Sequence, residues 1–343
     1  MTRKGWIESL RVVAAAAVVV THVVSGTYDS PDFGTEMLSV SYGREILDLV
    51  FFRSLTVWAV PVFLMISGYL LLDPQKELTL RKIKEYVWRM TAVLLTFGLI
   101  VCLIESCLDS PGRAVFSVIG MSVRNLIQGK SWEHLWYVYM MAGLYLMTPV
   151  LRSFFKTENR YAQSMVMAAL FLFTILIPTC NHLFRWKIVN ILPVNSSSLY
   201  YYMLGHYLRQ KEISRKKNLG YMAAAFSVLC VLSFWKTEDL RYVLNYENLF
   251  VMIFSVSIFC LAMKSPWMEQ MGQKKQIQNL AGLSFGIYII HPVFLNILNK
   301  GFHIYPVDFP WIAGEMGFAA AVFGCSVILV MLLKRVRWIK NII

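Results

Sequence analysis

The chain has 343 residues, of which 57% are hydrophobic and 15% are charged, and its mean hydropathy is +0.55. Soluble globular domains carry about 25% charged residues, so this composition excludes an ordinary soluble enzyme. The formal net charge of +13 would indicate a nucleic-acid partner in a soluble protein. In a membrane protein the same excess reflects which loops face the cytoplasm, and we expect no nucleic acid.

Apolar runs long enough to cross a bilayer recur along the whole sequence. They predict a polytopic, all-α membrane protein with about ten transmembrane helices in a single domain, residues 1–343. The sixth run is short and polar. The expected helices are 7–26, 50–72, 88–107, 134–151, 161–178, 198–208, 219–234, 248–263, 280–299 and 311–333.

The distribution of Lys and Arg predicts the orientation. If the N-terminus is cytoplasmic, the inner segments hold 22 of the 33 basic residues and the outer loops hold 10. Cytoplasmic loops carry an excess of Lys and Arg. We therefore expect both termini in the cytoplasm and the 27–49 and 108–133 loops outside.

The first predicted helix contains "LRVVAAAAVVVTHVV", with Arg11 and His22 at the two ends of a small apolar run. Eleven positions bring two residues to within about 20° of the same helix face, roughly 16 Å apart along the axis. Ionisable groups inside a membrane usually face a cavity, and Glu8 is placed to pair with Arg11. The alternative is a snorkelling Arg11 and a structural interhelical hydrogen bond from His22.

The ninth predicted helix contains "LAGLSFGIYIIHPVF", in which Ser284, Tyr288 and His291 share one face. Pro292 frees a backbone carbonyl, which is tolerated where a helix lines a cavity. The alternative is a polar seam that joins two helices.

Other polar positions lie at the ends of predicted helices. The second helix has Ser67-Gly68, which permits close backbone approach, followed by Tyr69. The fourth opens with "HLWYVYMM", where His134, Trp136 and Tyr137 fit either an acceptor site or an interfacial aromatic belt. His206 near the sixth helix is interpreted as structural.

A basic run leads into the third predicted helix. It suits either an inner anchor or the phosphates of a cytoplasmic ligand, since Arg and Lys both bind phosphate. Its members are Lys76, Arg81, Lys82, Lys84 and Arg89.

Together these pieces resemble the acyltransferase-3 family of integral membrane acyltransferases. The resemblance rests on Arg11 and His22 in the first helix, the basic run, and three stretches: "FLMISGYLLL", "HLWYV" and "LSFGIYIIHPVF". It implies a multi-pass enzyme of the bacterial cytoplasmic membrane. Such an enzyme moves an acyl group, commonly acetyl from acetyl-CoA, onto an extracytoplasmic carbohydrate or small molecule.

The resemblance also implies roles for residues. His22 is then the catalytic candidate and Arg11 belongs to the donor path. The family's basic segment usually reads Arg-x-x-Arg, whereas here it reads Arg81-x-x-Lys84. We expect catalysis at His22, His291 or Tyr288, acyl-CoA at Arg11, Ser67, Tyr69, Arg81, Lys82, Lys84 and Arg89, and the acceptor at His134, Trp136, Tyr137 and Ser284.

We expect no metal site and no permanently bound cofactor, with acyl-CoA acting as co-substrate. A second interpretation comes from the same family, whose domains also form the membrane half of serine racemase-type glycopeptide-resistance proteins. There the implied role is binding or transporting L-serine. A transporter is expected to show broken helices and internal symmetry, and the sequence shows no repeat.

Overall fold

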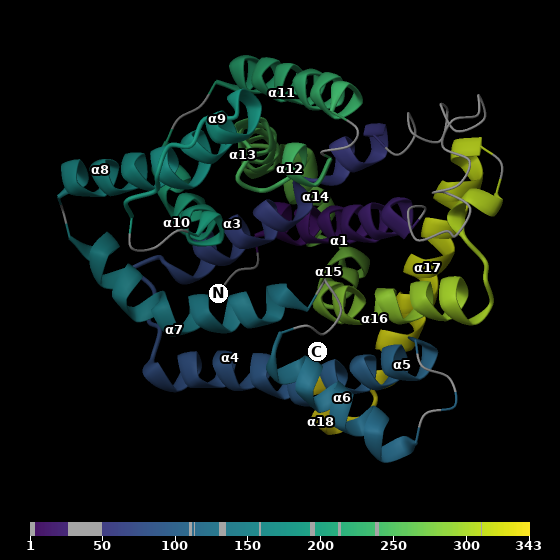
Figure 1. Cartoon of the computed structure of the whole chain (residues 1–343). Helices are drawn as coiled ribbons and strands as arrows, with labels where there is room; N and C mark the ends of the chain where they lie inside the picture. Colours follow the sequence, from purple (N-terminus) through teal and green to yellow (C-terminus); the bar gives the residue numbers. More distant parts are fainter. Residues whose placement is uncertain are drawn as a thin grey trace. The chain divides into compact units, whose positions relative to one another are not determined.

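The computed structural model of the chain (Figure 1) describes residues 4–26, 50–109, 112, 114–129, 135–157, 159–192, 196–211, 214–236, 240–309 and 311–343. Within these ranges the regular structure is helical, and none of them contains a strand. His134 and the 27–49 loop lie outside the described residues. The all-α prediction is confirmed.

Seven helices of the described chain are long and apolar enough to cross a membrane, or up to nine if each of two bent pairs counts as one span. The prediction of a polytopic membrane protein is confirmed. The seven are Gly5–Ser25, Val50–Leu71, Leu80–Ile104, Trp136–Lys156, Arg160–Phe184, Arg215–Trp235 and Ala313–Leu333.

The predicted sixth span forms a helix, α10 (Ser197–Tyr207), but it is too short to cross a membrane by itself. Its 11 residues extend about 16 Å, against a hydrocarbon core of about 30 Å. The helix begins where Ser196 accepts a hydrogen bond from the Leu199 backbone N–H. By length and apolarity the described residues supply seven spans, or up to nine, and the expected number of ten stays a prediction.

One of the bent pairs consists of α13 (Leu249–Met263) and α14 (Pro266–Gln273), whose axes differ by 68°. The break has a local cause. Ser265 caps α14 by accepting from the Met268 backbone N–H, and Pro266 begins the new helix because it lacks an N–H. The second pair is interrupted between α15 (Lys275–Ala281) and α16 (Ser284–Asn296).

The chain divides into two compact units. The first comprises residues 1–25, 36–77 and 150–281, and the second comprises 26–35, 78–149 and 282–343. The single domain expected over residues 1–343 stays a prediction, because a compact unit need not be an independently folding domain.

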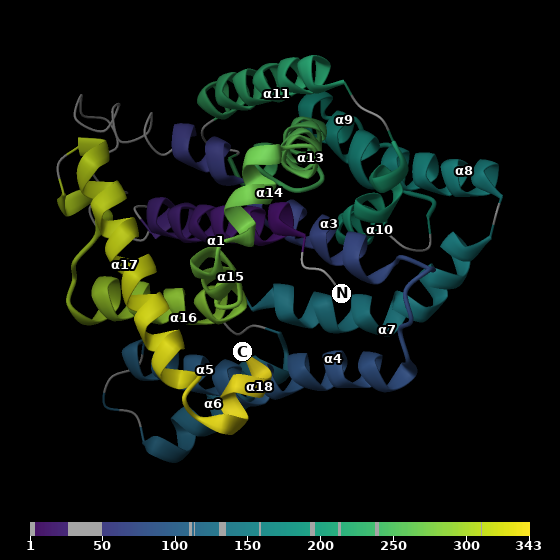
Figure 2. The same cartoon turned by 180° about the vertical axis from the view of Figure 1, so that it is seen from behind.

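In the first unit, two glycines bring α3 (Ala59–Leu71) and α10 into backbone contact. A Cβ on Gly68 would lie 1.7 Å from the Tyr202 carbonyl oxygen, and one on Gly205 would lie 2.0 Å from the Met65 carbonyl oxygen. Only glycine permits this approach. In the same unit, α11 (Arg215–Trp235) packs along α13, as both views show (Figures 1 and 2).

The N-terminus of α1 (Gly5–Gly26) is closed by α14. The Glu269 carboxylate accepts hydrogen bonds from the Gly5 and Trp6 backbone N–H groups, both at 3.0 Å. A Cβ on Gly272 would lie 1.7 Å from the Gly5 carbonyl oxygen. Ser9 donates to the Met268 carbonyl at 2.7 Å. Residues far apart in sequence therefore fix where α1 begins.

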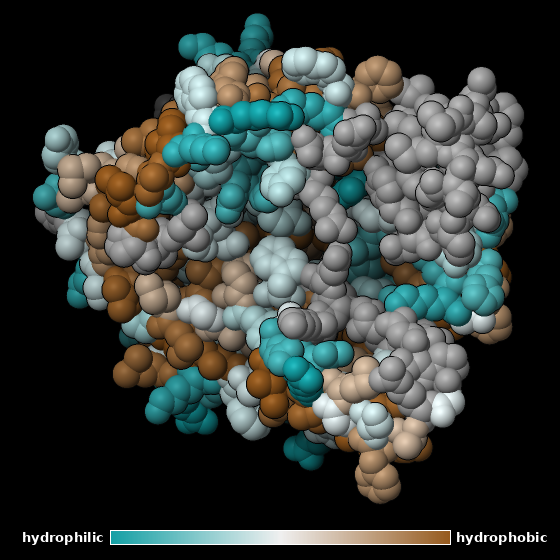
Figure 3. All heavy atoms as spheres, viewed as in Figure 1, coloured by the Kyte–Doolittle hydropathy of each residue, from teal (hydrophilic) through white to brown (hydrophobic). Residues whose placement is uncertain are grey.

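The spans differ in how much of their surface is enclosed by protein. In an apolar 18-residue stretch of Gly5–Ser25 and of Val50–Leu71, 61% and 67% of the residues are buried, against 22% in the corresponding stretches of Arg215–Trp235 and Ala313–Leu333. Large apolar side chains such as Val231 and Met331 are exposed on the latter two, and Figure 3 shows exposed apolar side chains in brown on the face in view. We interpret these apolar surfaces as lipid-facing.

The second unit contains α4 (Leu80–Val93), α5 (Leu99–Asp109), α6 (Val115–Ile127), most of α7 (Trp136–Lys156), α16, α17 (Trp311–Leu333) and α18 (Arg337–Ile342). A π turn, Leu94–Gly98, joins α4 to α5 in one span. α17 packs on α16, where Gly286 leaves room for Val330 (Figure 2). Ser122 of α6 donates to the Cys102 carbonyl of α5 at 3.2 Å.

Candidate functional site

Arg11 and His22 lie on the same face of α1, because the helix runs without interruption from Gly5 to Gly26. The predicted contact between Glu8 and Arg11 is present, with 3.8 Å between Arg11 Nη1 and Glu8 Oε1. Glu8 is buried and Arg11 is half-buried. Arg11 is therefore held toward the beginning of α1, one turn from its counter-ion.

The hydrogen bond of His22 fixes the chemistry of its ring. Its Nδ1 lies 2.9 Å from the Val18 carbonyl oxygen, and since a carbonyl only accepts, Nδ1 carries the hydrogen. In the neutral imidazole the lone pair is then on Nε2. The neighbouring Thr21 forms a 2.7 Å hydrogen bond with Thr56, which ties this end of α1 to the helical segment 50–56.

His291, in the second unit, has the same geometry. Its Nδ1 lies 3.0 Å from the Ile287 carbonyl oxygen and the side chain is fully buried. Both histidines therefore present Nε2 as the proton acceptor in the neutral state. The helix continues through Pro292 to Asn296.

A row of aromatic rings extends from His291. The Tyr288 ring centroid lies 6.2 Å from that of His291 and 5.2 Å from that of Tyr137 on α7. Trp136 is 37% exposed and its ring lies 6.2 Å from Tyr137. Ser284 is buried one helical turn before Tyr288. The structure therefore brings five predicted residues together in the second unit.

Tyr69, at the end of α3, is enclosed by cations and aromatic rings of the first unit. Lys4 donates a hydrogen bond to its hydroxyl, and the Arg209 guanidinium lies 5.2 Å from its ring centroid. Trp6 packs edge-to-face on it at 5.2 Å. Ser67 donates to the Phe63 carbonyl at 2.9 Å, a bond within its own helix.

The basic residues of α4 occupy the beginning of that helix, which Thr79 caps. Arg81, Lys82 and Lys84 are exposed, and Arg81 forms an ion pair with Glu85 at 3.2 Å. Arg89 is half-buried. It donates to the Ile342 carbonyl at 2.9 Å and lies over the Phe285 ring at 5.2 Å, so this residue fastens α18 and α16 to α4.

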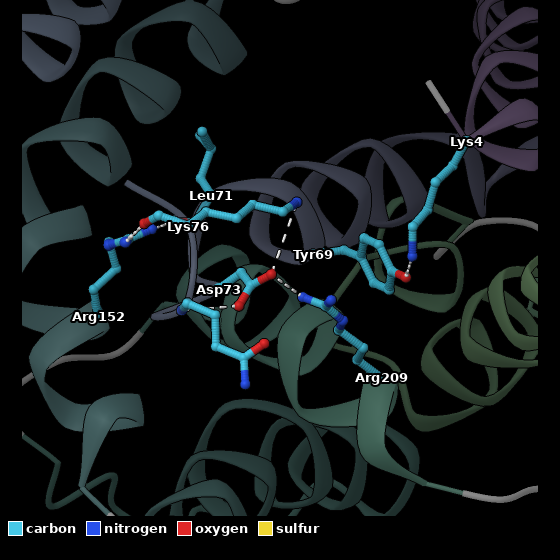
Figure 4. Close-up of polar contacts among 8 residues, drawn as sticks. Lys4, Tyr69, Leu71, Asp73, Lys76, Arg152 and Arg209 are labelled. Carbon is cyan, nitrogen blue, oxygen red and sulfur yellow. Dashed lines mark hydrogen bonds and ion pairs between the residues drawn. The ribbon is translucent and has the colours of Figure 1, made fainter. Parts of the chain in front are cut away.

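A polar cluster follows α3 in the first unit, and Figure 4 shows its side chains. Asp73 is buried and forms an ion pair with Arg209, and Lys76 Nζ lies 3.9 Å from Asp73 Oδ2. Arg152 donates to the Leu71 carbonyl at 2.7 Å and to the Lys76 carbonyl. These contacts hold the segment that leaves α3 in a defined conformation.

The charges of this cluster act on one another. Burial raises the pKa of Asp73, but the hydrogen bonds from Arg209 and from the Gln75 backbone N–H, with the charge of Lys76, bring the pKa below its ordinary value. Burial lowers the pKa of Lys76. Asp73 opposes that change, whereas Arg209, Lys4 and Arg152 reinforce it.

Each unit has a histidine on an apolar helix, and its Nδ1 is hydrogen-bonded to the carbonyl one turn earlier. A family model described as an acyltransferase domain matches residues 4–334 of this chain. The chain belongs to the acyltransferase-3 family. The resemblance inferred from its motifs is thereby confirmed, and membership indicates a membrane acyltransferase.

The match extends from Lys4 to Lys334 and so includes all the candidate residues of this acyltransferase-3 protein. Searches against curated proteins and against solved structures gave no match. The individual roles of the candidate residues therefore stay predictions.

Sequence reasoning did not assign a role in the acyltransferase-3 domain to Asp73, Arg152 or Arg209. Asp73 and Arg209 are 136 positions apart, and periodicity within a helix cannot pair such residues. One signal was available. In "GYLLLDPQK" a lone carboxylate follows an apolar helix at its inner end, where the topology expects cations, and a carboxylate there needs a basic partner.

Proposed function

We propose that this protein transfers an acyl group from cytoplasmic acyl-CoA to an extracytoplasmic acceptor, and that this acyl group is acetyl. The acceptor provides a hydroxyl or an amine and is a cell-surface carbohydrate or another small molecule. The protein would act in the bacterial cytoplasmic membrane with both termini in the cytoplasm. Family membership, the positive-inside pattern and the geometry of His22 support this proposal.

The reaction assigns a defined step to His22. The acceptor oxygen attacks the thioester carbonyl carbon while its proton moves to His22 Nε2, and the C–S bond then breaks. The proton returns to the leaving thiolate, which gives an O-acyl product and free CoA. The hydrogen bond from Nδ1 to Val18 keeps the lone pair on Nε2, and general base catalysis of this kind contributes about 10²–10⁴-fold in rate.

The donor would approach from the inner side. The exposed cations of α4 would attract its phosphates. Surface charges of this kind act mainly on the rate of encounter and on its salt dependence. Arg11 would also hold the donor, and its contact with Glu8 positions the side chain for this role. Ser67 and Tyr69 would contact the same ligand near the inner end of α3.

The acceptor would contact the row of aromatic rings in the second unit. All three residues, Tyr137, Tyr288 and Trp136, offer ring faces, the two tyrosines add hydroxyl groups and Trp136 adds an indole N–H. Such groups are features of binding sites for small polar molecules with apolar faces. Ser284 and His134 would complete this part of the site. His291 is the rival base in the same unit.

The decisive experiment compares His22→Asn with His291→Asn in protein reconstituted into vesicles. An Asn amide still donates to the carbonyl one turn earlier but offers no basic nitrogen, so the helix contact survives while the base is lost. We expect His22→Asn to lose about 10²-fold or more in acceptor-dependent CoA release, with CoA affinity unchanged. Full activity in His22→Asn together with its loss in His291→Asn would transfer the role to His291.

One observation favours the alternative of L-serine binding or transport. The α13–α14 pair is bent by 68°, and broken helices are typical of transporter binding sites. Vesicles separate the two functions. Acyl transfer predicts thioester cleavage without accumulation of serine, whereas transport predicts uptake of labelled L-serine with no dependence on acyl-CoA.

A further inference from the structure

The polar cluster of the first unit has more positive than negative charge. Four cations, Lys4, Lys76, Arg152 and Arg209, lie around Asp73 (Figure 4). Two other carboxylates of the described chain are near: Glu269, which interacts with Lys4 and whose oxygens already accept the Gly5 and Trp6 N–H groups, and the exposed Glu77, next to Lys76 in the chain. The cations of the cluster therefore still outnumber its carboxylates.

These cations repel one another at a partly buried site. The pKa of Lys76 is lowered by burial and by the charges of Arg209, Lys4 and Arg152, in spite of the neighbouring carboxylate. The side chains of Lys76 and Arg209 are 23% and 29% exposed, so a ligand from solution can reach them. Partly buried charges of one sign are stabilised by an ion of the other sign.

A buried imidazole lies near the same charges. His206 of α10 is 3% exposed, and its Nδ1 has no hydrogen-bond partner among the described residues. The charges that act on its ring are those of Asp73, Arg209, Arg152 and Lys76. Phe155 covers the ring with centroids 4.6 Å apart. This Nδ1–H can donate a hydrogen bond to a phosphate oxygen.

The scaffold around the cluster is rigid. Gly68 and Gly205 hold α3 against α10, which places Asp73 and Arg209 together beyond the ends of these helices. The guanidinium of Arg152 fixes the intervening segment through the Leu71 and Lys76 carbonyls. Preorganised cations lose little conformational freedom when an anion binds.

We infer that Lys76, Arg209 and His206 form a binding site for a phosphate group, and that this phosphate belongs to the acyl-CoA donor. The inference deepens the proposed function and rests on it. Arg and Lys bind phosphate through charge-assisted hydrogen bonds, and the positive-inside pattern assigns this cluster to the side where acyl-CoA is found. The exposed α4 cations then attract the donor, and this cluster holds it.

The test is calorimetric titration of the purified protein with CoA. Lys76→Gln and Arg209→Gln should each weaken CoA binding by roughly 10- to 100-fold, since a hydrogen bond to a charged group is lost. Asp73→Asn should tighten it, because a competing negative charge is removed while the side chain still accepts from Arg209. The matched control is Lys216→Gln, an exposed cation on the same predicted side, which should leave the affinity within about twofold.

The outcomes separate this inference from the proposed function. Normal CoA affinity in folded Lys76→Gln and Arg209→Gln variants would show that these cations serve only as helix-end charges. That result would overturn the phosphate site and leave the proposed acyl transfer unaffected. Absence of CoA binding to the unmodified protein would overturn the proposed function and the site with it. Displacement of CoA by added phosphatidylglycerol would assign the site to a lipid headgroup and overturn the acyl-CoA assignment, whereas unchanged affinity supports it.

Discussion

Gly68 of α3 and Gly205 of α10 each lie against the backbone of the opposite helix, so that a Cβ on either one would overlap a carbonyl oxygen. This reciprocal contact positions the two helix ends from which Asp73 and Arg209 extend. The position of this end of the first unit therefore depends on glycine at both positions, because an alanine methyl group would not fit.

Gly68→Ala or Gly205→Ala should lower the free energy of unfolding by about 1–3 kcal/mol or more, because the new methyl group meets a backbone atom that cannot rotate away. Gly220→Ala on α11 is the matched control, since a Cβ there meets nothing within 4 Å. It should be neutral or stabilising by about 0.5–1 kcal/mol, as expected for alanine in a helix. Thermal unfolding in detergent measures all three, and equal loss in the control would contradict the close contact.

The ion pair of Asp73 should make stability depend on pH in the acid range. The pKa of Asp73 is lower in the folded protein than its ordinary value of 3.8, so the folded state favours the ionised carboxylate. This stabilisation is complete above about pH 5 and disappears as the pH falls through the lower folded pKa. Asp73→Asn should be less stable than the native protein at neutral pH, and this difference should shrink below pH 4.

Glu85→Gln provides the control for that measurement. Glu85 pairs with Arg81, but both side chains are largely exposed, and such pairs contribute little to stability. Denaturant unfolding at a series of pH values should show no acid-dependent difference for this variant. If the free energy of unfolding of Glu85→Gln changed with pH as much as that of Asp73→Asn, the effect would come from the change in net charge and not from the Asp73–Arg209 pair.

Replacing Arg81 and Lys84 together by Ala should weaken CoA binding and reduce its salt dependence, because these exposed cations attract phosphates over a distance. The control is the double replacement of Arg185 and Lys187, which are also exposed and are expected on the outer side. Titrations at several salt concentrations compare the two pairs. Unchanged affinity and salt slope in the first pair would assign the α4 cations to membrane topology alone.

The predicted orientation can be tested by cysteine labelling in intact cells. All six native cysteines, of which Cys107 and Cys325 are exposed and Cys180 and Cys230 half-buried, are first replaced by Ser. Single cysteines are then introduced at Arg185 or Lys211. A membrane-impermeant reagent should label the cysteine at 185 from outside and the cysteine at 211 only after lysis. Labelling at 211 in intact cells would reverse the topology.

The sequence predicts well those features that depend on a continuous stretch of chain. The uninterrupted apolar run of residues 12–20 predicts α1, and its regular period predicts the shared face of Arg11 and His22. The spacing of Ser284, Tyr288 and His291 works in the same way. Hydropathy measures whether a segment is long and apolar enough to span a membrane.

Features that depend on packing between distant segments could not be predicted. The Ser67-Gly68 pair indicated a close approach, but nothing in the sequence identified α10 as the partner. The 68° bend before Pro266 arises from a local cap. Hydropathy predicted the end of α13 at this point but did not indicate that a second helix, α14, follows directly. The Asp73–Arg209 pair was missed because each residue by itself looks like a helix-end charge.

The contact between α1 and α14 has a consequence for biosynthesis. The backbone N–H of Gly5 receives its partner from Glu269, 264 positions later. At about 5–20 residues per second, translation of that interval takes roughly 15 to 50 seconds. During this time α1 has no Glu269 cap at its N-terminus, and its N–H groups there rely on water. A nascent chain that stalls before residue 265 would therefore hold a complete α1 without the helix that fixes its end.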